Sequence, residues 1–179
     1  GVVYAVSGNF HCDPQSRINA FAHVNHRPDA PRVGILLCIN GTGISNSWIR
    51  KLIGEPDLTY DEMNQTAALS PVGSKGLSIL PFGNGAERIL GDRDIGAQVH
   101  HLNFNIHGRP EVLRAVQEGV AFSFKYGIDI MQSLKIRPRV LKAGAANMFL
   151  SPVFCKTLAS VAGVTIELYN TDGAQGAAR

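Results

Sequence analysis

The last forty residues constrain the fold most, because their pattern alternates between strand and helix. A short apolar segment at 138–143 leads into a turn of tiny residues at 143–147, and a helical pattern covers 148–161. A second β-prone segment follows at 163–169, and 172–178 is expected to begin another helix. A unit of strand, tight turn, helix, strand and helix is typical of α/β proteins.

The turn of this unit is almost without side chains. Its sequence, Ala143-Gly-Ala-Ala-Asn147, lets another object approach the backbone closely, and phosphates and purine rings are frequent choices. The same small residues also allow a helix to pack tightly on a sheet. The segment alone supports both interpretations equally.

The first third of the chain predicts three strands and one helix. The segments 2–6, 18–24 and 32–39 are β-prone, and the third is nearly all apolar, which indicates a central strand. Short turns between them favour antiparallel pairing. Ser45 or Asn46 is expected to cap a helix that ends at Gly54, with its inward side chains at Trp48, Ile49 and Leu52.

The middle of the chain predicts two more helices around a long loop. Thr59 and Glu62 form a capping-box pattern for a helix that ends near Leu69. A short strand at 77–80 precedes an irregular stretch at 83–107, and long ordered loops are often functional.

The longest helix is expected from Arg109 to Leu134, with Pro110 in its first turn and an apolar stripe along one face. Gly119 lies inside this helix and costs up to about 1 kcal/mol relative to alanine, so we expect a close neighbour there. Together the segments predict an α/β domain over 1–179, with a mixed β-sheet flanked by helices.

Composition excludes several classes of function. With 45% hydrophobic and 17% charged residues, the chain is ordinary for a globular protein, and its net charge of +3 is scattered. We therefore expect neither a nucleic-acid partner nor a membrane. The three cysteines are far apart and form no metal or redox motif, which favours a cytoplasmic location. The chain begins in a strand-like segment without Met and stops soon after a helix start, so we expect one lobe of a longer protein.

Several sequence blocks resemble the C-terminal domain of the FGGY carbohydrate kinases. Arg114-Ala-Val-Gln-Glu-Gly-Val-Ala-Phe122 is similar to the family's RAVLEGVAF, and Leu80-Pro-Phe-Gly-Asn-Gly-Ala-Glu-Arg88 to its LPYLSGER. Further similar blocks occur in the family's order at 1–7, 19–23, 48–54 and 172–178. Within the family the resemblance is greatest to xylulokinases.

Two departures from the family pattern stand out. The nucleotide turn is Lys142-Ala-Gly-Ala-Ala-Asn-Met-Phe149 where the family usually has three glycines, and the GER motif has become Gly85-Ala-Glu-Arg88. Near the altered GER motif we expect substrate contacts or loop geometry to differ. Glu87 and Arg88 either face the cleft or lock the long loop as an ion pair, and the second, structural role is favoured.

The resemblance implies an actin-like ATPase (ribonuclease H-like) fold, of which this chain is one lobe, and transfer of the γ-phosphate of ATP to a sugar hydroxyl with Mg²⁺. It places the catalytic base and the metal ligands outside this chain, so we assign no catalytic and no metal residue. The implied partners are ATP, a small sugar such as a ketopentose, the N-terminal lobe of the same protein and, less directly, a second copy in a homodimer.

The residues that remain for this chain lie on the adenosine side. The resemblance assigns the nucleotide turn to Gly144, Ala145 and Asn147, where Asn147 either donates to the nucleotide or caps the following helix. It also assigns nucleotide-facing positions to Gly43 and Ser47, and it leaves Gly1 as the remnant of a phosphate loop. Gly43 is equally explained as part of a strand-to-helix turn.

The resemblance thus implies the C-terminal lobe of an ATP-dependent kinase that converts D-xylulose to D-xylulose 5-phosphate. The alternatives are another FGGY kinase of the ribulose, gluconate or glycerol type, and a non-catalytic actin-like nucleotide-binding module. The isolated chain is expected to be inactive.

Overall fold

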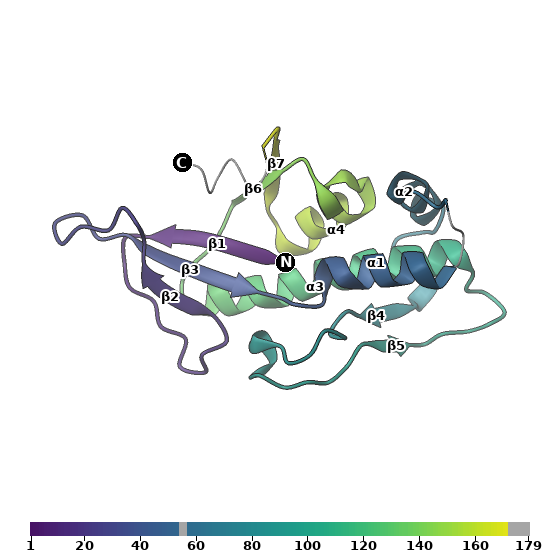
Figure 1. Cartoon of the computed structure of the whole chain (residues 1–179), viewed down its shortest axis with the longest axis horizontal. Coiled ribbons are helices and arrows are strands. Elements are labelled where there is room, and N and C mark those ends of the chain that lie inside the picture. The colour runs from purple at the N-terminus through teal and green to yellow at the C-terminus, as the bar shows by residue number, and fades with distance from the viewer. Residues whose placement is uncertain (54–56, 172–179) are drawn as a thin grey trace.

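The computed structural model describes residues 1–53 and 57–171. The helix start expected at 172–178 and the helix end expected at Gly54 lie outside the described residues. Figure 1 shows the longest helix, α3 (Arg109–Ser133), along the long axis of the molecule, with the other elements arranged around it.

A three-stranded antiparallel sheet covers one end of α3. Its strands are β1 (Val2–Ser7), β2 (Asn19–Ala22) and β3 (Val33–Cys38), in the order β1-β3-β2. All three predicted strands and their antiparallel pairing are confirmed. Strand β3 is central and packs Ile35 and Leu37, both fully buried, into the core with α3. Its nearly continuous apolar sequence reflects this central position.

Strands β6 (Val140–Gly144) and β7 (Thr165–Tyr169) pair in parallel, and helix α4 (Pro152–Ala162) connects them. The predicted helix at 148–161 begins later than expected. Ser151 caps α4 by accepting a hydrogen bond from the Phe154 N–H at 3.3 Å, and Pro152 occupies the first turn, where it loses no hydrogen bond. The preceding residues, Asn147–Leu150, form a 3₁₀ turn, η3.

Helix α1 (Thr42–Ile53) starts before the predicted caps. Three side chains were expected to point inward, and for two of them this prediction is wrong. Ile49 is buried, but the side chains of Trp48 and Leu52 are 60% and 62% exposed. Within the described residues α1 packs on α3 with one face only, so the apolar residues on its other face stay uncovered.

Helix α2 (Tyr60–Ala68) begins with the predicted capping box between Thr59 and Glu62. The stretch 83–107 is less irregular than expected. It contains a 3₁₀ turn, η2 (Arg88–Leu90), and strand β5 (Gln98–His100), which pairs antiparallel with β4 (Ser78–Leu80). Another 3₁₀ turn, η1 (Ser74–Gly76), lies between α2 and β4. The described strands therefore fall into three separately hydrogen-bonded sheets.

The close neighbour expected at Gly119 is present. A Cβ atom added there would lie 1.8 Å from the carbonyl oxygen of Ile79, so α3 and β4 approach at this point with no room for a side chain. Within the described residues, no helix combines the length and the apolar character that crossing a membrane requires.

Candidate functional site

The turn after β6 is held by backbone hydrogen bonds. The Ala145 N–H donates to the Tyr169 carbonyl at 2.8 Å, and the Ala146 N–H donates to the Gly144 carbonyl at 2.8 Å. Asn147 then takes a left-handed conformation, with φ of 53°. Asparagine is among the few residues other than glycine that adopt this conformation readily, so its presence here has a conformational reason.

The absence of a side chain at Gly144 serves packing. An added Cβ atom would lie 2.5 Å from the carbonyl oxygen of Thr171, so the chain that leaves β7 occupies the space beside this glycine. The neighbouring Ala145 is exposed. The bare turn was interpreted either as a site for close ligand approach or as a requirement of packing. At Gly144 the reason is packing, and the space available for a ligand lies farther along the turn.

The side chain of Asn147 does not cap α4, because Ser151 fills that role. Asn147 is exposed and has no hydrogen-bond partner for its amide in the part of the chain that the structure describes. The capping alternative is therefore wrong. Among the residues that the structure describes, nothing occupies the amide group, which can contact a ligand.

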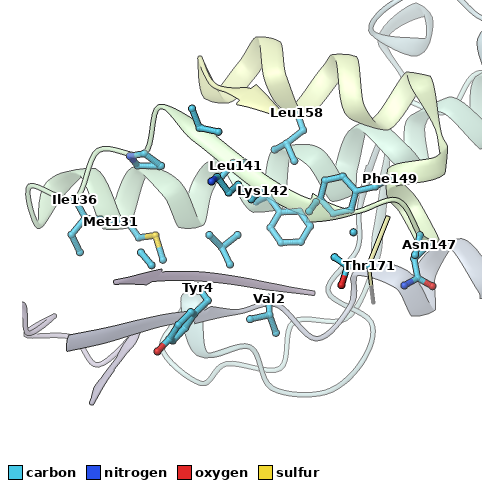
Figure 2. Close-up of a pocket in the computed structure, with 18 residues that line it drawn as sticks. Val2, Tyr4, Met131, Ile136, Leu141, Lys142, Asn147, Phe149, Leu158 and Thr171 are labelled. Carbon is cyan, nitrogen blue, oxygen red and sulfur yellow. The ribbon is translucent and has the colours of Figure 1, made fainter. Parts of the chain in front are cut away.

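A cavity of about 770 Å³ lies beside this turn, between β1 and β6 (Figure 2). Asn147 and Thr171 line it at one end, and Gly144, which packs against the Thr171 carbonyl, also lines it. The rest of the wall is mostly apolar, with side chains such as Phe124, Met131, Leu141, Phe149 and Leu158. Two predicted site residues thus share this cavity.

The start of α1 holds the other predicted residues. The Gly1 nitrogen donates to the Thr42 hydroxyl at 2.6 Å, which places Gly1 against the first residue of α1. Gly43 is exposed, and a Cβ atom added there would meet nothing within 4 Å. Ser47 lies one turn farther along and is half-buried. Gly43 and Ser47 do not line the cavity, so the predicted residues form two groups.

Glu87 fixes the start of α1, a role that the sequence did not reveal. Its carboxylate is fully buried and accepts hydrogen bonds from the N–H groups of Asn40, at 3.0 Å, and Gly41, at 2.9 Å. A carboxylate at this position also complements the positive end of the helix dipole. Arg88 does not pair with Glu87 and donates instead to Asn19 at 2.9 Å. The favoured structural role of Glu87 and Arg88 is therefore correct, but the predicted ion pair between them is wrong.

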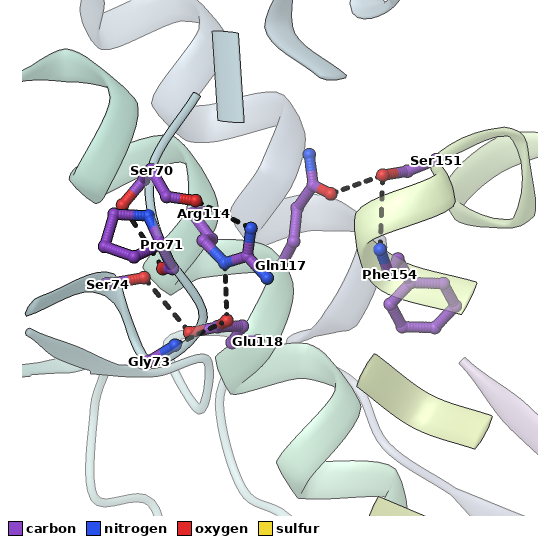
Figure 3. Close-up of polar contacts among 9 residues, drawn as sticks. All are labelled: Ser70, Pro71, Gly73, Ser74, Arg114, Gln117, Glu118, Ser151 and Phe154. Atoms are coloured by element: carbon purple, nitrogen blue, oxygen red, sulfur yellow. Dashed lines mark hydrogen bonds and ion pairs between the residues drawn. The ribbon is translucent and has the colours of Figure 1, made fainter. Parts of the chain in front are cut away.

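A buried polar network fixes the helices behind the site (Figure 3). Arg114 pairs with Glu118 at 2.7 Å on α3, and Glu118 also accepts hydrogen bonds from the Gly73 N–H and the Ser74 hydroxyl, each at 3.0 Å. Glu118 therefore joins α3 to the segment after α2.

The same helix face anchors the start of α4. The hydroxyl of Ser151, which caps α4, donates to the Gln117 side-chain oxygen at 2.5 Å, and the Gln117 amide donates to Asn64 on α2 at 3.0 Å. Because Ser151 directly follows η3, this contact ties the turn at 144–147 to the core of α3.

The ionisable residues of this region offer no arranged metal site. Within residues 1–53 and 57–171, no group of three or more His, Cys, Asp or Glu side chains is placed to hold a metal ion. At the turn and at the start of α1, this chain can therefore let a ligand lie close to its backbone. It can also offer hydrogen bonds from an amide or a hydroxyl group and a surface of complementary shape.

A family model described as the FGGY family of carbohydrate kinases, C-terminal domain, matches residues 9–178. The chain belongs to this family. Its expected membership and α/β class are thereby confirmed. A xylulose kinase of Escherichia coli is 29% identical over the whole chain, which covers 36% of that protein. A xylulose kinase of Haemophilus influenzae is also 29% identical, over 64% of the chain and 23% of that protein.

Solved structures of FGGY kinases confirm the actin-like ATPase fold. A ligand-bound xylulose kinase from Lactobacillus acidophilus matches 96% of the chain with a TM-score of 0.81 at 22% identity, and the match covers 34% of that structure. A Plasmodium falciparum glycerol kinase with ADP matches 96% of the chain with a TM-score of 0.75 at 19% identity, again over 34% of its length. The chain thus spans about a third of the length of the relatives that it matches throughout.

Proposed function

We propose that this chain is the nucleotide-side domain of a cytoplasmic, ATP-dependent sugar kinase that phosphorylates D-xylulose to D-xylulose 5-phosphate. The observation that carries the proposal is the family match over 9–178, together with similarity over the whole of this chain to about a third of a xylulose kinase. In such a reaction ATP supplies the transferred phosphoryl group, and Mg²⁺ neutralises the charge that develops on it.

The part that this chain performs is positioning. We assign the adenosine side to two places: the turn with Ala145 and Asn147, and the start of α1 with Gly43 and Ser47. The open space beside Gly43 fits a nucleotide, as does the exposed amide of Asn147, which has no partner among residues 1–53 and 57–171. Gly1 packs against Thr42 and Gly144 against Thr171, and neither place has room for a side chain.

The catalytic base and the Mg²⁺ ligands are assigned to the N-terminal lobe of the longer protein. Phosphoryl transfer requires a group that accepts the proton of the sugar hydroxyl, and we assign no residue of this chain to that role. The chain alone is therefore expected to give no turnover.

An assay of ADP release tests the proposal directly. The longer polypeptide would be incubated with ATP, Mg²⁺ and a panel of ketopentoses, polyols and aldonates, and D-xylulose should give the highest kcat/KM. A preference for glycerol or gluconate would move the protein to another branch of the family. Turnover by the 179-residue chain alone would contradict the assignment of the base to the other lobe.

A non-catalytic nucleotide-binding module is the second candidate, because the fold is shared with such proteins. The absence of ADP release with every sugar, in a polypeptide that still binds ATP, would favour it. The RAVQEGVAF block at 114–122 argues against it, since that block resembles the kinases of the family.

A further inference from the structure

A buried glutamine in the middle of α3 joins three helices. Gln117 is fully buried, its side-chain oxygen accepts a hydrogen bond from the Ser151 hydroxyl at 2.5 Å, and its side-chain nitrogen donates to the Asn64 side-chain oxygen on α2 at 3.0 Å. Figure 3 shows the first of these bonds reaching from α3 to the start of α4. Burial of an amide costs free energy that an apolar side chain of similar size would not incur. Core packing alone therefore does not explain a glutamine here.

The hydrogen-bond pattern allows one orientation of the Gln117 amide. The Ser151 hydroxyl accepts from the Phe154 N–H at 3.3 Å, and its single proton is directed to the Gln117 oxygen. The Gln117 NH₂ group then faces Asn64, whose side-chain oxygen can only accept. Because the amide is held at both its oxygen and its nitrogen, Gln117 gives Ser151 a fixed point of attachment on α3.

Ser151 passes this constraint to the turn that carries Asn147. The Ser151 N–H donates to the Met148 carbonyl at 3.0 Å, and the Phe149 N–H donates to the Ala146 carbonyl at 3.1 Å. Asn147 begins η3, which these two hydrogen bonds close, and η3 ends directly before Ser151. The position of the Asn147 amide therefore depends on where Ser151 is held.

The other hydrogen bonds of this turn do not reach α3. Within residues 1–53 and 57–171, the remaining partners of segment 145–151 lie in the segment itself, in β6, in β7 or in α4. The Cys155 thiol, for example, donates to the Phe149 carbonyl at 3.3 Å. Apolar packing of Phe154 and Leu158 holds α4 on the core, and Gln117 adds a directional contact at the end where the turn lies.

We propose that Gln117 is a positioning residue for ATP, which through Ser151 holds η3 so that the Asn147 amide is already placed for the nucleotide. This role rests on the proposed function, in which Asn147 contacts the nucleotide. Gln117 is fully buried and acts only through Ser151. A ligand that meets a preset group avoids the cost of ordering it on binding. Loss of the contact should therefore weaken the binding of ATP and leave the binding of sugar unchanged.

Steady-state kinetics of Gln117→Leu in the longer polypeptide provide the first test. Leucine is similar in size to glutamine and stands at the matching position of the family's RAVLEGVAF, so the variant should fold. The KM for ATP should rise by about three- to tenfold, the effect of one buried hydrogen bond, while kcat and the KM for the sugar stay unchanged.

Two further variants separate positioning from stability. Ile128 is also fully buried and lies about three turns farther along α3, so Ile128→Val should lower the Tm and leave the KM for ATP unchanged. Adding Gln117→Leu to Ser151→Ala should raise the KM for ATP no further than Ser151→Ala alone, because both changes remove the same hydrogen bond.

Amide hydrogen exchange without ATP tests the position of the turn independently of kinase activity. In Gln117→Leu the amides of Phe149 and Ser151 should exchange at least about threefold faster than in the parent. The amides of Ile35 and Leu37, in the central strand β3, provide the internal control and should change little.

An unchanged KM for ATP in folded Gln117→Leu, in a parent with normal kinase activity, would overturn the positioning role and leave the proposed function standing. Unchanged exchange at Phe149 and Ser151 would also overturn it, as would an equal rise in the KM for ATP in Ile128→Val. A parent polypeptide that binds no ATP would overturn the proposed function, and the role of Gln117 with it.

Discussion

Two helical glycines show how differently the same residue type is used in this chain. Gly119 lies against the carbonyl of Ile79, whereas Gly43 faces open space. Alanine favours a helix over glycine by about 1 kcal/mol, but overpacking costs about 1–3 kcal/mol. We predict that Gly119→Ala lowers the free energy of unfolding by about 1–2 kcal/mol and that Gly43→Ala leaves it unchanged or raises it. Urea unfolding of the two variants provides the measurement, and equal effects would contradict the packing at Gly119.

At Asn147 the conformational and the ligand-binding roles can be separated. Its backbone is left-handed, so Asn147→Ala should cost about 1 kcal/mol of stability, whereas Asn147→Gly should keep the turn. If the amide contacts the nucleotide, Asn147→Gly weakens ATP binding by the longer polypeptide without loss of stability. Calorimetric titration with ATP measures this, and unchanged affinity in the glycine variant would leave Asn147 with the conformational role alone.

At the scale of elements, the Arg114–Glu118 pair decides how α3 holds the loop after α2. Both side chains are buried, and the Glu118 carboxylate accepts from Arg114, the Gly73 N–H and the Ser74 hydroxyl. Removal of this carboxylate would leave the buried guanidinium of Arg114 without its counter-charge. We predict that Glu118→Ala lowers the free energy of unfolding by about 3–5 kcal/mol. The double variant Arg114→Met with Glu118→Met should recover a large part of this loss. A double variant that is as unstable as Glu118→Ala would show that the charge pair is not the cause.

Glu111, in the first turn of α3, should make the stability of the fold depend on pH. The hydrogen bond from Lys75, with a further bond from the Gly108 N–H, lowers the pKa of Glu111 from 4.5 to about 2. The folded protein then holds this proton less tightly than the unfolded chain, so stability rises with pH across this window. The contribution is complete above about pH 4.5 and disappears as the pH falls toward about 2.

Thermal unfolding of Glu111→Gln, which cannot ionise, checks the assignment. The difference in Tm between variant and parent should be larger at about pH 6 than at about pH 3. An equal difference at both values would mean that Glu111 contributes by its shape alone.

Local signals explain what was predictable among the elements. Strand β3 and the capping box of α2 were predicted because each depends on neighbours in the sequence. The outward face of Trp48 and strand β5 were missed because they depend on packing and pairing with distant segments.

The candidate site follows the same rule. Resemblance to a family marked Gly43 and Asn147 as nucleotide-facing, and these roles stay predictions. Glu87 was singled out by its motif, but its partners lie 46 and 47 residues away in the sequence. No local pattern reveals a contact across that separation, and so its role at the start of α1 required the structure.

For the whole molecule, the central claim is that this domain supplies the nucleotide side of a sugar kinase, with the chemistry completed by another lobe. The start of α1 and the turn after β6 come from opposite halves of the sequence and are both tied to α3, through packing and through Gln117, respectively. The account therefore predicts that changes at these places alter the use of ATP and leave sugar recognition unchanged.

Steady-state kinetics of Gly43→Leu in the longer polypeptide test this claim most directly. Leucine is a good helix former, and a Cβ atom at this exposed position meets nothing within 4 Å, so the fold should be preserved. The added side chain fills the space assigned to the nucleotide, so the KM for ATP should rise by at least about tenfold while the KM for the sugar stays unchanged. An unchanged KM for ATP in the folded variant, or a rise only in the KM for the sugar, would contradict the account.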